Sequence, residues 1–170
     1  MVDKEKKLEL INQQLAALLG NERNMIANLA NASALLYNSL QDLNWTGFYL
    51  REKGELILGP FQGKPACVRI PIGKGVCGSS ARDLKTYLID NVDEFPGHIA
   101  CDSASRSELV VPIIVEGRLV GVLDIDSPVE KRFDKVDQEF IEEFVSILIS
   151  KTDFSKYKFK LKTINHQKYP

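Results

Sequence analysis

Hydrophobic residues near the start of the chain recur every three to four positions, which is the period of a helix. Over residues 4–19 they line one side of a predicted helix, and a Gly-Asn pair at residues 20–21 provides its end signal. The same period returns over residues 22–40 and predicts a second helix. Its apolar stripe includes the small residues Ala30 and Ser33, which allow close packing against a sheet.

The period then changes to two, which indicates strands. Residues 45–50 and 55–58 predict a hairpin across a Gly-containing turn, and residues 66–71 predict a third strand. Residues 73–82 are rich in small side chains and predict a short helix that can approach its neighbours closely. Residues 86–89 predict a short fourth strand, so the middle of the chain is mostly β.

The most regular strand pattern is a hairpin formed by residues 108–115 and 119–123, which are joined at a turn around Gly117. A long polar loop, residues 91–107, precedes it, and a loop of that length in a compact domain is often functional. After the hairpin, Asp134 can cap a final amphipathic helix. Two leading helices, mostly antiparallel strands and a closing helix predict an α+β fold.

Composition and charge narrow the classes of protein that fit. With 170 residues and 44% hydrophobic content, the chain fits one domain with a full core. A net charge of −1 without a basic block in the body argues against nucleic-acid binding. No stretch approaches the roughly 18 apolar residues of a membrane span, so we expect a soluble, cytoplasmic protein without a membrane partner. Three widely spaced cysteines argue for reduced thiols whose disulfide, if formed, is functional.

The C-terminal tail differs in charge from the rest of the chain. Residues 151–170 carry a net charge of +5, whereas residues 1–150 carry −6. The tail alternates basic and apolar residues, a pattern that fits an exposed edge strand or a partner-binding arm, while a poorly structured tail is the simpler interpretation. The alternating residues are Lys156, Tyr157, Lys158, Phe159, Lys160, Leu161 and Lys162. We assign no function to the tail.

Cys101 is the first candidate for chemistry, because it lies in the polar loop beside Asp102. His98 and Arg106 are close in sequence and can supply charges that stabilise a thiolate. An exposed thiol of this kind can act as a nucleophile. An idle loop thiol is the alternative, and the spacing alone does not decide between them.

Cys67 is the second candidate. It falls within the predicted strand 66–71, on the face opposite Val68 and Ile70, and therefore away from the core. If that face also carries the acids of the hairpin, Cys67 can form a disulfide with Cys101, provided that their Cα atoms lie within about 7 Å. The sequence leaves that condition open.

Three carboxylates lie on the predicted hairpin. Asp124 and Asp126 share one strand face because side chains alternate, and Glu108 begins the partner strand near Cys101. Clustered acids repel each other, so that one of them can stay protonated and act as a proton donor. A solvated strand face is the alternative. A metal site is a third option, which the scarcity of histidine disfavours.

Three further residues each allow two interpretations. Cys77 lies between Val76 and Gly78, which fits a small packed residue, with a backup thiol as the alternative. Trp45 and Tyr49 share one strand face and can be core aromatics or walls of a ligand pocket.

Four motifs together link the chain to an enzyme family. Residues 59–67, 73–78, 95–102 and 121–127 closely resemble the free methionine-(R)-sulfoxide reductases, which are GAF-domain enzymes. The resemblance covers about residues 20–150. It implies a central antiparallel sheet of about six strands with helices on one face and a ligand pocket on the other.

The resemblance also implies roles for individual residues. Cys101 matches the nucleophile, Cys67 the resolving cysteine, and Cys77 a third cysteine that is a candidate auxiliary thiol. In the implied reaction, Cys101 attacks the sulfoxide sulfur, an acid protonates the oxygen, and Cys67 then closes a disulfide. The residues that match the substrate pocket are Trp45, Tyr49, Glu108, Asp124 and Asp126, and Glu108 and Asp126 are the candidate acids.

The family further implies a division of the chain and a set of partners. Residues 1–150 form a GAF-like catalytic domain, in which residues 1–20 are an N-terminal helix and residues 21–150 the family core, and residues 151–170 form the lysine-rich tail. Its substrate is free methionine sulfoxide, no cofactor is bound, the external reductant is similar to thioredoxin, and a homodimer is expected. Preference for the R epimer follows from the resemblance alone. The competing interpretation is a non-catalytic GAF module that senses a small ligand or redox state.

Overall fold

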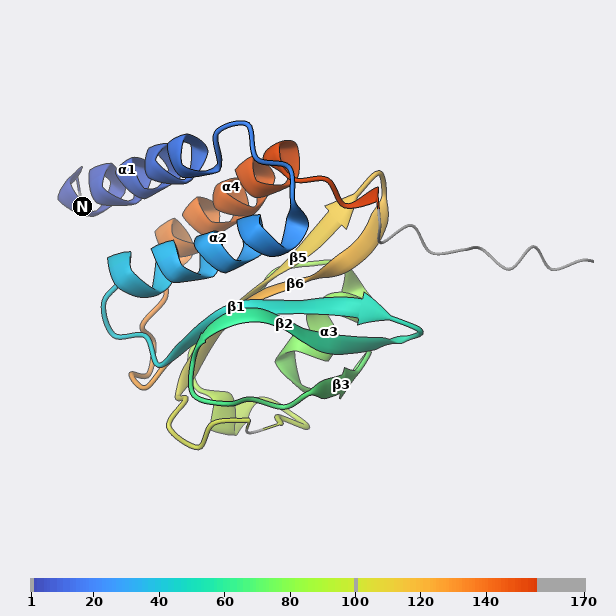
Figure 1. Cartoon of the computed structure of the whole chain (residues 1–170). Helices are drawn as coiled ribbons and strands as arrows, with labels where there is room; N and C mark the ends of the chain where they lie inside the picture. Colours follow the sequence, from blue (N-terminus) through green and yellow to red (C-terminus); the bar gives the residue numbers. More distant parts are fainter. Residues whose placement is uncertain (1, 100, 156–170) are drawn as a thin grey trace, which may run out of the picture.

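Six strands form one antiparallel sheet in the computed structural model, which describes residues 2–99 and 101–155 (Figure 1). Their order across the sheet is β3-β2-β1-β6-β5-β4, so that β1 and β6 lie at the centre. The strands are β1 (Trp45–Glu52), β2 (Glu55–Gly63), β3 (Arg69–Pro71), β4 (Tyr87–Ile89), β5 (Ser107–Val115) and β6 (Arg118–Ser127). The predicted α+β fold with about six antiparallel strands is confirmed.

Three long helices cover one face of this sheet (Figure 1). α2 (Met25–Ser39) and α4 (Lys135–Lys151) pack on the strands, and α1 (Val2–Leu19) packs against these two helices. The larger hydrophobic core fills the space between these helices and the sheet. The short α3 (Gly75–Asp83) packs on the opposite face, against β3, β5 and β6. The predicted separation of a helical face from a pocket face is confirmed, with α3 as an addition on the pocket side.

Local sequence signals explain where the elements begin and turn. The residues of both hairpin turns, 53–54 and 116–117, have positive φ angles, which is the type I′ geometry that matches the twist of paired strands. Asp134 caps α4 as predicted, and it does so in a reciprocal capping box with Asp137. Asn24 caps α2, which therefore begins at residue 25 rather than at residue 22.

The third predicted strand is shorter than expected. β3 begins at Arg69, so the prediction that Cys67 lies in a strand is wrong, and Cys67 lies in the segment that leads into β3. The carbonyl of Cys67 accepts a hydrogen bond from the hydroxyl of Tyr49 (2.9 Å) instead of pairing with a strand. Val68 consequently points to solvent, with 63% of its surface exposed, although strand alternation placed it on the core side.

Packing continues after the last helix. Thr152 and Phe154 are buried, and Phe154 belongs to the helix-side core. The alternating lysine pattern of the tail falls on residues 156–170, which lie outside the described residues. None of the helices found between residues 2 and 155 is long and apolar enough to cross a membrane.

Candidate active site

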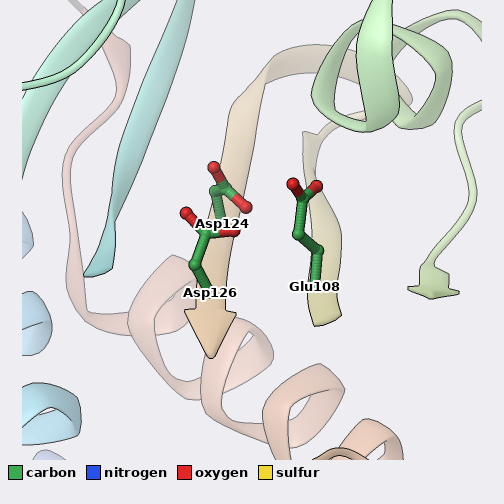
Figure 2. Close-up of side chains that lie close together, drawn as sticks. All are labelled: Glu108, Asp124 and Asp126. Atoms are coloured by element: carbon green, nitrogen blue, oxygen red, sulfur yellow. The ribbon is translucent and has the colours of Figure 1, made fainter. Parts of the chain in front are cut away.

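The β5–β6 hairpin directs three acids to the pocket face of the sheet. Leu123 and Ile125 of β6 are completely buried in the helix-side core, so Asp124 and Asp126 emerge on the other face. Glu108 of β5 pairs with Asp126 in the strand register and points the same way. Figure 2 shows the three carboxyl groups directed into one space, and each offers an oxygen within 4.8 Å of the others. The sequence prediction of a shared face is confirmed.

Burial changes the protonation of this acid cluster. Glu108 and Asp124 are each only 7% exposed, and Asp126 is partly buried. Burial raises the pKa of Asp124 to about 6, partly opposed by a hydrogen bond from the Cys77 thiol. Burial and the charge of Asp124 raise the pKa of Glu108 well above its usual range. The pKa of Asp126 is raised well above its usual range by burial and by the neighbouring acids. The cluster therefore holds protons at neutral pH.

Two oxygens of this cluster are free to accept from a ligand. Oδ1 of Asp124 and Oδ1 of Asp126 are buried and have no hydrogen-bond partner in the described part of the chain. A buried acceptor without a donor is costly, so these oxygens suit a ligand with N–H or O–H donors. Such oxygens also suit Mg²⁺ or Ca²⁺, which prefer oxygen ligands, and Glu108, Asp124 and Asp126 together could supply three of them.

Two aromatic residues form the wall beside the acids. Trp45 and Tyr49 of β1 are 2% and 1% exposed, and their rings stack with centroids 5.8 Å apart. Trp45 pairs with Asp126 in the strand register. Its indole nitrogen donates to the carbonyl of Lys64 (3.2 Å). The interpretation as core aromatics is confirmed, because both rings belong to the smaller core. Both residues also line the pocket, and their contact with a ligand stays a prediction.

A disulfide joins Cys67 to Cys101 at this pocket, which Cys101 lines. Their Cα atoms are 5.4 Å apart, which meets the distance condition. Both cysteines are half-buried. The two segments meet although Cys67 is not in a strand, because the loop after β2 lines the same pocket through Pro65 and Ala66.

Cys77 is a buried thiol within the same site. It lies on α3, is 5% exposed, and donates a hydrogen bond to Asp124. Burial and the nearby acids raise its pKa well above the usual range, so it stays protonated. The next residue, Gly78, brings α3 close to the sheet, because a Cβ there would lie 2.4 Å from the carbonyl oxygen of Pro71. The prediction of a small packed cysteine is confirmed.

The loop between β4 and β5 contains His98 and Arg106, the two residues that were expected to supply charges to a thiolate. His98 lies inside the site, with Nδ1 at 3.6 Å from Oε1 of Glu108, a contact that sequence spacing did not indicate. Arg106, which seemed able to stabilise a thiolate, instead forms an exposed salt bridge with Asp93 (3.2 Å) and does not line the pocket. The Pro-Gly pair before His98 was the available signal for a turn that fixes this side chain.

Asn44 was not predicted as part of the site. Its Nδ2 donates to Oδ2 of Asp102 (3.1 Å) and to Oγ of Ser105 (3.0 Å), which ties the segment after Cys101 to the start of β1. The N–H of Ala104 and the amide of Asn44 lower the pKa of Asp102, so its carboxylate stays charged. Nothing in the sequence next to Asn44 points to this contact, because its partners are about sixty residues away.

The pocket itself is narrow in this disulfide form. Its cavity volume is about 30 Å³, which is enough to hold a water molecule. The predicted site residues that line it are Trp45, Tyr49, Cys77, Cys101, Glu108, Asp124 and Asp126. The structure thus brings both the acids and the nucleophile candidate to one cavity.

Comparison with known proteins places this site in a family. A family model described as "GAF domain" matches residues 3–150. The chain is 57% identical to Protein YtsP of Bacillus subtilis over 148 residues, which cover 86% of this chain and 91% of the relative. It is 49% identical to the free methionine-R-sulfoxide reductase of Escherichia coli over 150 residues, which cover 86% and 91% of the two chains.

A solved structure of a free methionine-R-sulfoxide reductase is also similar to this chain. The free methionine-R-sulfoxide reductase from Neisseria meningitidis, in complex with its substrate, is 41% identical and superposes with a TM-score of 0.84. The match covers 87% of this chain and 89% of that chain. The chain therefore belongs to the GAF-domain family and, within it, to the family of the free methionine-R-sulfoxide reductases.

Proposed function

We propose that this protein reduces free L-methionine-(R)-sulfoxide to L-methionine and uses its own cysteine thiols as the electron donor. The observation that carries the proposal is the Cys67–Cys101 disulfide, one cysteine of which lines a pocket containing three buried acids. Relatives that are 49% and 43% identical are named for this activity. Preference for the R epimer rests on those names.

In the proposed reaction, the thiolate of Cys101 attacks the sulfoxide sulfur while a protonated acid of the cluster donates to the oxygen. The S–O bond breaks and the OH group transfers to Cys101 as a sulfenic acid, so that methionine sulfur gains two electrons and Cys101 loses two. The acid then takes up one proton, which balances the proton that Cys101 released when its thiolate formed. The thiol of Cys67 then displaces water from the sulfenic acid and forms the disulfide.

Free substrate is distinguished from a peptide by its ammonium group. The unpartnered oxygens of Asp124 and Asp126 can accept hydrogen bonds from that ammonium, which then favours their ionised forms. The Trp45 and Tyr49 rings offer an apolar wall for the methyl and methylene groups. Backbone N–H groups can take the carboxylate. A peptide-bound methionine sulfoxide lacks the ammonium, so these two oxygens would be left without a donor.

The disulfide form is the proposed end state of a turnover. Cys101 attacks as a thiolate, so the bond has to be reduced before the next substrate can react. Thiol exchange with an external dithiol protein similar to thioredoxin can reopen it, because both cysteines are half-buried rather than enclosed. We propose this reductant, no bound cofactor, and Cys77 as an auxiliary thiol that acts through Asp124.

The proposed catalytic unit spans residues 1–150 and works in the cytoplasm as a homodimer. These statements rest on the family resemblance. Light scattering of the purified full chain tests the dimer directly, and a monomer mass at working concentration contradicts it.

A single-turnover experiment tests the chemistry without a reductase system. Fully reduced protein, freed of excess reductant, is mixed with free methionine-(R)-sulfoxide, and the methionine formed and the thiols lost are counted. Wild type should form methionine and lose the thiols of Cys67 and Cys101, whereas Cys101→Ser should form none. Cys67→Ser should form one methionine per chain and stop. Methionine formation by Cys101→Ser would overturn the mechanism, and no methionine from wild type would favour the GAF sensor.

A further inference from the structure

A tight turn holds His98 in the site. Phe95, Pro96, Gly97 and His98 form a turn closed by the N–H of His98, which donates to the carbonyl of Phe95 (3.1 Å). Gly97 has a φ of 75°, and Pro followed by Gly is typical of a type II turn. The ring of Phe95 packs edge-on against Tyr87 of β4, with centroids 5.9 Å apart, and this contact anchors the turn to the sheet.

The imidazole reaches the acid cluster from this turn. Its side chain is 14% exposed and lines the pocket. Nδ1 lies 3.6 Å from Oε1 of Glu108 and is a buried nitrogen with no hydrogen-bond partner among the described residues. Glu108 is the acid of the cluster that this nitrogen approaches. An unpaired buried nitrogen beside a buried carboxyl group needs only a small closure to form a hydrogen bond.

We propose that His98 is a positioning residue for the proton donor: its neutral imidazole accepts a hydrogen bond from protonated Glu108 and holds that proton in the pocket. This inference rests on the proposed function and selects Glu108 over Asp126 as the acid. His98 acts through Glu108 and need not touch the substrate. The proton then passes from Glu108 to the sulfoxide oxygen. Glu108 afterwards takes up one proton, which balances the proton that Cys101 released when its thiolate formed.

The charge state of the pair agrees with this arrangement. Burial lowers the pKa of His98, which keeps the imidazole neutral at neutral pH, although Asp93 opposes the shift. A neutral imidazole with its proton on Nε2 has a lone pair on Nδ1. An imidazolium would instead favour the ionised form of Glu108 and remove the acid. The other titratable or charged groups around the pair are Asp124, Asp126, Cys77, Tyr49, Lys74, Asp102 and, once reduced, Cys101.

Two variants with amide side chains, His98→Asn and His98→Gln, distinguish a hydrogen bond to Glu108 from a role of His98 in packing alone. His98→Asn places an amide oxygen near the position of Nδ1 and can still accept from Glu108. His98→Gln has the same amide on a longer chain, which carries it past that position, and it is closer to histidine in size. The readout is the pH profile of kcat/KM for free methionine-(R)-sulfoxide, whose alkaline limb reports loss of the acid proton from the free enzyme.

We expect the alkaline limb of the pH profile to move to lower pH by about one unit in His98→Gln and in His98→Ala. At pH values above the limb, kcat/KM of these variants should be roughly tenfold lower than that of wild type. His98→Asn should keep the limb of wild type. Unmoved limbs in His98→Gln and His98→Ala, or equal shifts in His98→Asn and His98→Gln, would overturn the inference. Inactive wild type would overturn the proposed function instead.

A measurement on wild type keeps the inference testable if the variants fail to fold. The ¹³C signal of the Glu108 carboxyl group, assigned by its loss in Glu108→Gln, is followed in the reduced protein from pH 5 to pH 9. A protonated carboxyl at pH 7 is expected. An ionised carboxyl at pH 7 would overturn the inference whatever the variants do.

Discussion

Opening the Cys67–Cys101 disulfide should lower the free energy of unfolding by an amount that follows from its place in the chain. The bond joins cysteines 34 positions apart. The loop-closure relation for that separation gives about 3.8 kcal/mol at 25 °C, from restriction of the unfolded chain. For a domain of this size, a loss of that magnitude lowers the melting temperature by roughly 8–15 °C.

Circular dichroism of thermal unfolding measures this effect. Oxidised wild type should lose roughly 8–15 °C when a reductant is added, whereas Cys67→Ser should melt at the lower temperature with or without reductant. Cys77→Ser is the matched control, because it removes a cysteine but keeps the disulfide, and it should respond to the reductant as wild type does. A wild-type melting temperature that is unchanged on reduction would refute the reasoning.

Two further predictions concern the acid cluster. Burial raises the pKa of Asp124 to about 6, above roughly 3.9 in an unfolded chain, so its protonated form stabilises the oxidised fold at low pH, and this contribution is lost as pH rises through 6. In urea unfolding, the stability of Asp124→Asn relative to wild type should therefore rise by about 2 kcal/mol between pH 4 and pH 7, and a constant difference would contradict the raised pKa. N-acetyl-methionine sulfoxide, which lacks the ammonium, should show a much higher KM than the free amino acid, and equal KM values would remove ammonium recognition.

Periodicity predicted the parts of the site that depend on one element at a time. Alternation along β6 was enough to place Asp124 and Asp126 together on the face opposite Leu123, because the hairpin register is local and its inner face is fully buried. The capping box at Asp134 is equally local, since both partners lie within one helical turn.

Contacts between distant segments could not be predicted in this way. Cys67 was predicted to lie in a strand, but it lies in a loop, where its carbonyl accepts a hydrogen bond from the hydroxyl of Tyr49, eighteen positions earlier. Asn44 joins the site through Asp102. The contact between His98 and Glu108 depends on where the fold places the turn that carries His98. In each case the partner is set by the packed fold, and no spacing in the sequence encodes it.

The most direct test of the central claim is NADPH oxidation in a thioredoxin-coupled assay of the full-length wild-type protein. Free L-methionine-R-sulfoxide, its S epimer and a peptide-bound methionine sulfoxide are offered to separate samples, with Cys101→Ser as the control protein. Sustained turnover with the free R form alone, absent in Cys101→Ser, is the predicted result. No turnover with any of the three substrates, although the thiols are shown to be reduced, would contradict the assignment and favour a sensing role.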